Sequence, residues 1–349
     1  MKRSPCARAV AAAVLVLWIC PLVCAAPALG PSGLQREVVF SNYSQLASGP
    51  ELLRRTLSPL DALQVQQALA QSGRQLQTQS LNLAEERFIL YVPAQAPLFG
   101  YALLVFVPPW DDARLPQGWS AVLDRYGMIF VSAARSGNDQ NVTARREPLA
   151  LLAAYNVMQR YPVAAARVFV AGFSGGSRVA MRLALAYPDL FRGALLNAGS
   201  DPLGARGAIQ PPAELFSQLQ SSSRLIYLTG DRDLALAGDA ESIASMHKWC
   251  VFNIGSHVAL GRSHEAASAA ALDGALQTLL AADPPDEAKL ASCRTGIAAE
   301  VNSQLDKVQA LLAAGNRSAA QRLLTETDRY FGGLAAPRSV ELQNALSTP

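Results

Sequence analysis

A serine flanked by glycines is the part of this sequence with the clearest chemical potential. Residues 172–176 read GFSGG, which places Ser174 two positions from a glycine on each side. An apolar run, 168–171, precedes this stretch, and a helix-forming segment, 177–186, follows it. A strand, a sharp turn and a helix around G-x-S-x-G are typical of a nucleophile elbow, in which a strained serine sits at a helix N-terminus. The simpler alternative is a glycine-rich turn between any strand and helix of an α/β protein.

The glycine spacing argues against a bound nucleotide, and the histidine spacing argues against a bound metal. The glycine spacing is not G-x-G-x-x-G, and no lysine follows the glycines as a phosphate-binding loop would require. The sequence has three histidines, His247, His257 and His264, and no two of them have the spacing of metal ligands. We therefore expect neither a cofactor nor a metal.

A serine nucleophile needs an acid and a base, and candidates for both follow it in the sequence. The apolar segment 225–229 predicts a buried strand that ends at Asp231 and Asp233. This is where the carboxyl edge of a sheet would present a carboxylate. Asp233 is the predicted acid, and Asp231 is the alternative.

One histidine has the setting that a catalytic base needs. His264 precedes an alanine-rich helical segment and so lies on a loop between a strand and a helix. His257 is the alternative base, because it lies within or at the end of the strand that begins at residue 250. His247 lies in a helical segment before Trp249 and is expected to be a surface or core histidine.

The order Ser174, Asp233, His264 is that of the α/β-hydrolases. In such a triad the histidine takes the proton of the serine, and the aspartate fixes the imidazole tautomer. The backbone N–H of Gly175 is the predicted first donor to the oxyanion. The second donor should lie in the loop after the strand at 101–107, where two prolines have no N–H and Trp110 is the first residue able to donate.

The chain also resembles a known group of enzymes. The sequence of residues 167–180, RVFVAGFSGGSRVA, resembles the elbow of polyhydroxybutyrate-depolymerase-like and feruloyl-esterase-like α/β-hydrolases, which are commonly secreted. The resemblance extends to residues 100–107, to 136–138 with Arg145 and Arg146, and to 229–233, and it covers roughly residues 88–280. It implies an ester-cleaving fold without naming the substrate.

The N-terminus indicates export. Basic residues at positions 2, 3 and 8 precede an apolar core, 9–20, and residues 23–25 (VCA) offer a cleavage site. Residues 26–28 (APA) offer a second site, and an uncleaved anchor is the alternative to a signal peptide. We expect secretion, or export to the periplasm, with no stable membrane anchor.

Removal of residues 1–25 changes both the charge and the cysteine content. The formal charge falls from +3 to about zero, and no basic cluster interleaved with aromatics remains, so nucleic acid is not an expected partner. Of the five cysteines, only Cys250 and Cys293 stay. In an oxidising compartment they predict one disulfide, with two unpaired buried thiols as the alternative.

The predicted fold is α/β: an α/β-hydrolase sheet, mostly parallel, with helices on both faces. Half of the residues are apolar and 16% are charged, as in ordinary globular proteins. The predicted organisation is a signal peptide (1–25), an N-terminal helical extension (26–75), a hydrolase domain (76–283), and a C-terminal helical hairpin and tail (284–349). We expect a helix over 50–72, a hairpin of strands over 76–83 and 87–92, and a loosely held chain end after residue 331.

The predicted function is a secreted serine hydrolase that cleaves carboxylic esters, either small or polymeric, through an acyl-enzyme. Two alternatives belong to other classes. One is a peptidase or amidase on the same fold, which a triad alone does not exclude. The other is a degenerate hydrolase that acts as a periplasmic binding protein, against which the complete serine, aspartate and histidine set argues.

Overall fold

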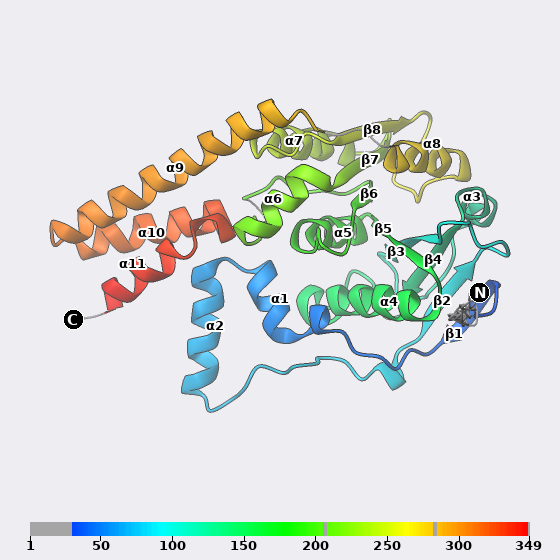
Figure 1. Cartoon of the computed structure of the whole chain (residues 1–349), viewed down its shortest axis with the longest axis horizontal. Helices are drawn as coiled ribbons and strands as arrows, with labels where there is room; N and C mark the ends of the chain where they lie inside the picture. Colours follow the sequence, from blue (N-terminus) through cyan, green and yellow to red (C-terminus); the bar gives the residue numbers. More distant parts are fainter. Residues whose placement is uncertain (1–29, 205–207, 282–284, 348–349) are drawn as a thin grey trace, which may run out of the picture.

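The computed structural model describes residues 30–204, 208–281 and 285–347 (Figure 1). The described residues form one eight-stranded sheet with the order β1-β2-β4-β3-β5-β6-β7-β8. Strands β3 to β8 pair in parallel, whereas β2 is antiparallel to both of its neighbours, β1 and β4. The fold is therefore α/β with a mostly parallel sheet, as the sequence predicts. The predicted signal peptide, 1–25, lies outside the described residues.

The elements alternate between strands and helices after β3, which is the pattern of a parallel sheet with crossover helices. The strands are β1 (Gly33–Val38), β2 (Phe88–Val92), β3 (Tyr101–Val107), β4 (Met128–Ala133), β5 (Val163–Phe173), β6 (Gly193–Asn197), β7 (Arg224–Gly230) and β8 (Ile254–Ala259). The helices are α1 (Gly49–Thr56), α2 (Pro59–Gln71), α3 (Trp119–Tyr126), α4 (Glu147–Arg160), α5 (Gly175–Ala186), α6 (Ala213–Ser222), α7 (Ala235–Lys248), α8 (Ala269–Leu280), α9 (Glu287–Ala313), α10 (Arg317–Phe331) and α11 (Arg338–Ser347). None of the helices in the described ranges is long and apolar enough to span a membrane.

Helices cover both faces of the sheet. Side chains of α3 and α8, such as Trp119 and Leu276, form one core with one face of the strands. Side chains of α4 to α7, such as Leu152, Leu183 and Phe216, form a second core with the opposite face. Every residue of β3, β4, β6 and β7 is buried, which explains why these strands are continuous apolar runs rather than alternating ones.

The start of the sheet differs from the prediction. Residues 76–83 are not a strand, and the partner of β2 is β1, which lies within the predicted helical extension. The two sides of β2 are taken by β1 and β4, so no place beside β2 is left for residues 76–83. β1 has an alternating, half-exposed pattern because it is an edge strand, and its sequence, GLQREV, carries little apolar signal.

The helix expected over residues 50–72 is two helices. α1 ends at Thr56, and α2 begins at Pro59, a residue that suits the first turn of a helix because its missing N–H would have no partner there. Ser58 caps α2 by accepting a hydrogen bond from the backbone N–H of Asp61.

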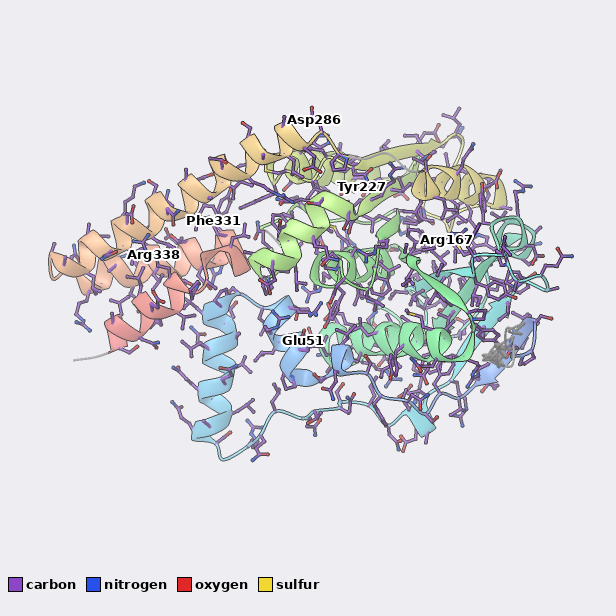
Figure 2. All side chains as sticks on the ribbon, in the orientation of Figure 1. Glu51, Arg167, Tyr227, Asp286, Phe331 and Arg338 are labelled. Atoms are coloured by element: carbon purple, nitrogen blue, oxygen red, sulfur yellow. A yellow bond between two sulfur atoms is a disulfide. The ribbon has the colours of Figure 1, made fainter. Side chains whose placement is uncertain are left out.

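The C-terminal hairpin of α9 and α10 is present, and a third helix follows it where we expected a loosely held end. α11 lies against α2, α9 and α10. Apolar residues of these helices, among them Leu305, Leu324 and Leu342, join the same core as α4 and α5. Phe331, at the end of α10, packs on Trp249 with ring centroids 5.8 Å apart and lies where the C-terminal helices meet the start of α6 (Figure 2).

One disulfide joins the sheet domain to the C-terminal helices. It links Cys250, just after α7, to Cys293 in the second turn of α9. The bridge encloses residues 251–292 and therefore β8, α8 and His264.

Candidate active site

Ser174 lies at the sharp turn between β5 and α5 with φ 55° and ψ −122°. This positive φ is costly for a residue with a side chain, at about 1–3 kcal/mol. The glycines around it are required by close contacts. A β-carbon on Gly172 would lie 2.2 Å from the carbonyl oxygen of Gly176, and one on Gly176 would lie 2.0 Å from that of Val107. The turn is thus packed so tightly that Gly172 and Gly176 have no room for a side chain.

The structure brings Ser174, His264 and Asp233 together in a hydrogen-bonded row. The Oγ of Ser174 lies 2.8 Å from Nε2 of His264, and Nδ1 of His264 lies 2.9 Å from Oδ2 of Asp233. Asp233 is 7% exposed, whereas half of the His264 side chain is exposed to solvent. The row therefore runs from a buried carboxylate to a hydroxyl that substrate can reach.

Both predicted acids help to build this row, in different ways. The second oxygen of Asp233, Oδ1, accepts a hydrogen bond from the backbone N–H of Ala235 at 2.9 Å, which fixes the carboxylate. Asp231 is exposed and instead accepts from the backbone N–H of Arg262 at 3.1 Å. Asp231 therefore holds the loop that carries His264 and does not contact the imidazole.

The other two histidines lie elsewhere. His257 sits in β8, and its Nε2 lies 2.9 Å from the hydroxyl of Thr278 on α8. His247 is exposed near the end of α7, beside the ring of Phe252. Ser177 is fully buried, and its hydroxyl has no hydrogen-bond partner among the described residues.

Asn197, at the end of β6, was not singled out by the sequence, yet it connects three parts of the site. Its backbone oxygen accepts from the N–H of Ser174 at 2.8 Å, and its Oδ1 accepts from the N–H of Ala267 at 2.8 Å. Its Nδ2 donates to the oxygen of Leu228 at 2.9 Å. The side chain is buried. Asn197 therefore ties the serine turn, strand β7 and the histidine loop to one another.

The loop after β3 lies against the serine turn, as an oxyanion loop must. The ring of Trp110 is 6.0 Å from that of Phe173, between centroids, and its buried indole N–H has no hydrogen-bond partner among the described residues. Gly175 begins α5, so its backbone N–H has no acceptor within the helix. A β-carbon on Gly175 would lie 2.2 Å from Oδ1 of Asn138, which places this exposed amide beside the same turn.

A second carboxylate, Asp239, is buried beneath the site. One of its oxygens accepts from the hydroxyl of Ser200 at 2.5 Å, and the other accepts from the hydroxyl of Thr229. Burial raises the pKa of this carboxyl, although both hydroxyl hydrogen bonds oppose the effect. Asp239 therefore joins the loop after β6 to the end of β7.

Comparisons with known proteins give structural likenesses only. No family model matches the chain, and no curated protein matches it. A ferulic acid esterase structure is 15% identical and aligns with 56% of this chain and 90% of its own, with a TM-score of 0.43. The S-formylglutathione hydrolase of Staphylococcus aureus is 11% identical over 55% and 90% of the two chains, with a TM-score of 0.42. The acetyl xylan esterase of Aspergillus awamori is 15% identical over 52% and 90%, with a TM-score of 0.41.

These matched structures are two esterases and a hydrolase. Their TM-scores lie below 0.5, and each alignment leaves more than two fifths of this chain uncovered. We therefore infer the chemistry from the geometry of the site alone.

Proposed function

We propose that this protein is a serine hydrolase that cleaves carboxylic esters through an acyl-enzyme. The observation that carries the proposal is the continuous row Ser174, His264 and Asp233, with hydrogen-bond distances of 2.8 and 2.9 Å. The positive φ of Ser174 supports it, because proteins keep such strain where function requires it.

Each group of the row has a defined role in the reaction. His264 Nε2 removes the proton of Ser174 Oγ as this oxygen attacks the ester carbonyl carbon. The carbonyl oxygen becomes the oxyanion, and the imidazolium that forms is stabilised by Asp233 across Nδ1. His264 then gives the proton to the departing alkoxide. Water repeats the sequence on the acyl-enzyme, and the carboxylic acid leaves.

The oxyanion needs donors that point at its position. We assign the first to the backbone N–H of Gly175, at the positive end of α5, and the second to the backbone N–H of Trp110. The contact between the β3 loop and the serine turn supports this pairing, because the β-carbon position of Gly176 falls 2.0 Å from the oxygen of Val107. Loss of one such donor typically lowers kcat by about 100- to 1,000-fold.

Active-site labelling tests the proposal. The purified protein should react with a fluorophosphonate probe and hydrolyse p-nitrophenyl esters, and Ser174→Ala should abolish both. Ser177→Ala is the matched control three residues away and should keep most of the activity, because its hydroxyl is buried outside the row. An unlabelled wild-type protein would support a binding function instead, and faster hydrolysis of anilides than of esters would support an amidase.

We also propose that the chain is exported and loses residues 1–25. The cystine supports this, since disulfides persist in oxidising compartments. N-terminal sequencing of the protein recovered from periplasm or culture medium should begin at Ala26. Recovery of Met1 in the membrane fraction would show an uncleaved anchor.

A further inference from the structure

A groove between α6 and α9, whose lining includes none of the triad residues, combines apolar walls with one arginine. Its volume is about 250 Å³, near the lower end of the range for small-ligand pockets. The two helices lie side by side (Figure 1). Its lining is Ala213, Phe216, Ser217, Gln220, Arg294, Ile297, Ala298, Val301, Asn302 and Leu334.

Arg294 is held firmly at one end of this groove. Its Nε donates to Oε1 of Gln220 at 2.6 Å, and its Nη2 donates to the backbone oxygen of Ser217 at 2.5 Å and to the hydroxyl of Ser221 at 2.8 Å. Gln220 is itself buried and fixed, because its amide nitrogen donates to the oxygen of Trp249 at 2.9 Å. The guanidinium is thus oriented before any ligand arrives.

The charge of Arg294 is not neutralised by these contacts. All three acceptors are neutral, and within the described ranges no carboxylate lies at salt-bridge distance from the guanidinium. Its Nη1 has no hydrogen-bond partner there. Burial lowers the pKa of Arg294, and Glu287 opposes this shift only through a longer-range charge interaction. A partly buried cation with one donor nitrogen that has no protein partner among the residues described favours an anionic ligand.

The groove is polar around Arg294 and mostly apolar beyond it, with Asn302 as the polar side chain next to Val301. Arg294, Ile297, Ala298 and Val301 fall on one face of α9 at helical spacing, so the groove extends about 10 Å from the arginine toward Val301. Leu334 adds a further apolar side chain to the lining. A ligand that satisfies both ends carries one negative group and an extended apolar chain.

We propose that this groove is a binding site for a medium-chain carboxylate. The carboxylate pairs with Arg294 at the Gln220 end, and the hydrocarbon chain lies between Phe216 and the α9 face that carries Ile297. The site is separate from the serine triad and does not depend on the proposed hydrolase activity.

Calorimetric titration with sodium octanoate tests this site on the full mature protein. Octanoate should bind once per chain, whereas acetate, which lacks the chain, and octylammonium, which reverses the charge, should give no measurable binding. Arg294→Met, which keeps the apolar stem, should weaken octanoate binding at least tenfold. Ala298→Phe, at an exposed position on α9, should fill the groove and weaken binding to a similar extent while leaving Arg294 in place.

Arg322→Met on the exposed face of α10 is the matched control and should bind like the wild-type protein. Saturating octanoate should leave the rate of fluorophosphonate labelling of Ser174 unchanged. The proposal is overturned if octanoate does not bind the wild-type protein, if either groove variant keeps its affinity, or if octanoate slows labelling equally in Arg294→Met, which would place it at the triad. Circular dichroism of each variant shows that a loss of binding is not a loss of folding.

Discussion

The triad region and the C-terminal helices are held in place by different kinds of interaction. Around Ser174, short hydrogen bonds fix individual atoms, as Asn197 does for both the serine turn and the histidine loop. The C-terminal helices are held by one cystine and by apolar packing of residues such as Leu305 and Leu324. Reacting atoms must be oriented within fractions of an ångström, whereas an attached helix needs only a buried face. Changes in the first region should therefore alter rate more than stability, and changes in the second should do the opposite.

The largest expected effect is at the histidine of the row. His264→Ala should lower kcat for a p-nitrophenyl ester by about 10⁴- to 10⁶-fold, because the members of a triad act as a unit. His257→Ala is the matched control and should keep activity within about tenfold, since its ring faces Thr278. Steady-state kinetics of both purified variants is the measurement. Equal losses would transfer the role of base to His257.

A smaller loss is expected at Asn197, which holds the site without belonging to the row. Asn197→Ala removes the acceptor for the N–H of Ala267 and should lower kcat about 10- to 100-fold through misplacement of His264. Asn197→Asp keeps this acceptor and should recover part of the rate, with KM little changed in both variants. Thermal unfolding of the variants distinguishes a positioning role from a structural one. A fall in stability with an unaltered rate would make Asn197 a purely structural residue.

The disulfide between Cys250 and Cys293 tests how the C-terminal helices are held. Cys293→Ser should lower the free energy of unfolding by about 2–4 kcal/mol, because the bridge restricts the unfolded chain over residues 251–292. The rate at moderate temperature should stay near that of the wild-type protein. Non-reducing peptide mapping of the wild-type protein should recover the two cysteine peptides linked. Two free thiols in exported protein would leave apolar packing as the sole attachment of α9.

The smallest effect concerns α1, in which Glu51 pairs with Arg54 and Arg55 of the same helix. The hydrogen bond from Arg54, followed by that from Arg55, lowers the pKa of Glu51 from its ordinary 4.5 to about 2. A lowered carboxyl pKa stabilises the folded state above pH 4.5, and this contribution disappears as the pH falls from 4.5 toward 2. Glu51→Gln should therefore cost about 1–2 kcal/mol at pH 7, after allowance for partial exposure, and almost nothing near pH 2.

Denaturant titrations across this pH range measure the effect at Glu51. Glu241→Gln is a suitable control, because that carboxylate is exposed and makes no hydrogen bond or ion pair in the part of the chain that the structure describes. A pH-independent difference at Glu51 would mean that lost packing, rather than lost charge pairing, accounts for the change in stability.

The sequence predicts most of the sheet and little of what borders it. Apolar runs such as residues 225–229 predict their strands because every side chain of β7 is buried. β1 was missed because none of its residues is buried, so it carries no apolar run. α11 was missed because only two of its residues, Ser339 and Leu342, are buried. The elbow around Ser174 can be predicted from the sequence because glycine there is a steric requirement. The role of Asn197 cannot be predicted in this way, since it depends on contacts with Ala267, 70 residues away.

The strained backbone at Ser174 affects which amino acids selection would favour at this position. Glycine tolerates a positive φ without penalty, so Ser174→Gly should raise the stability of the protein by about 1 kcal/mol while removing the nucleophile. A chain under selection for folding alone would gain from this replacement. The retained serine, at a position where its own side chain opposes the backbone, is what a lineage under selection for turnover would preserve.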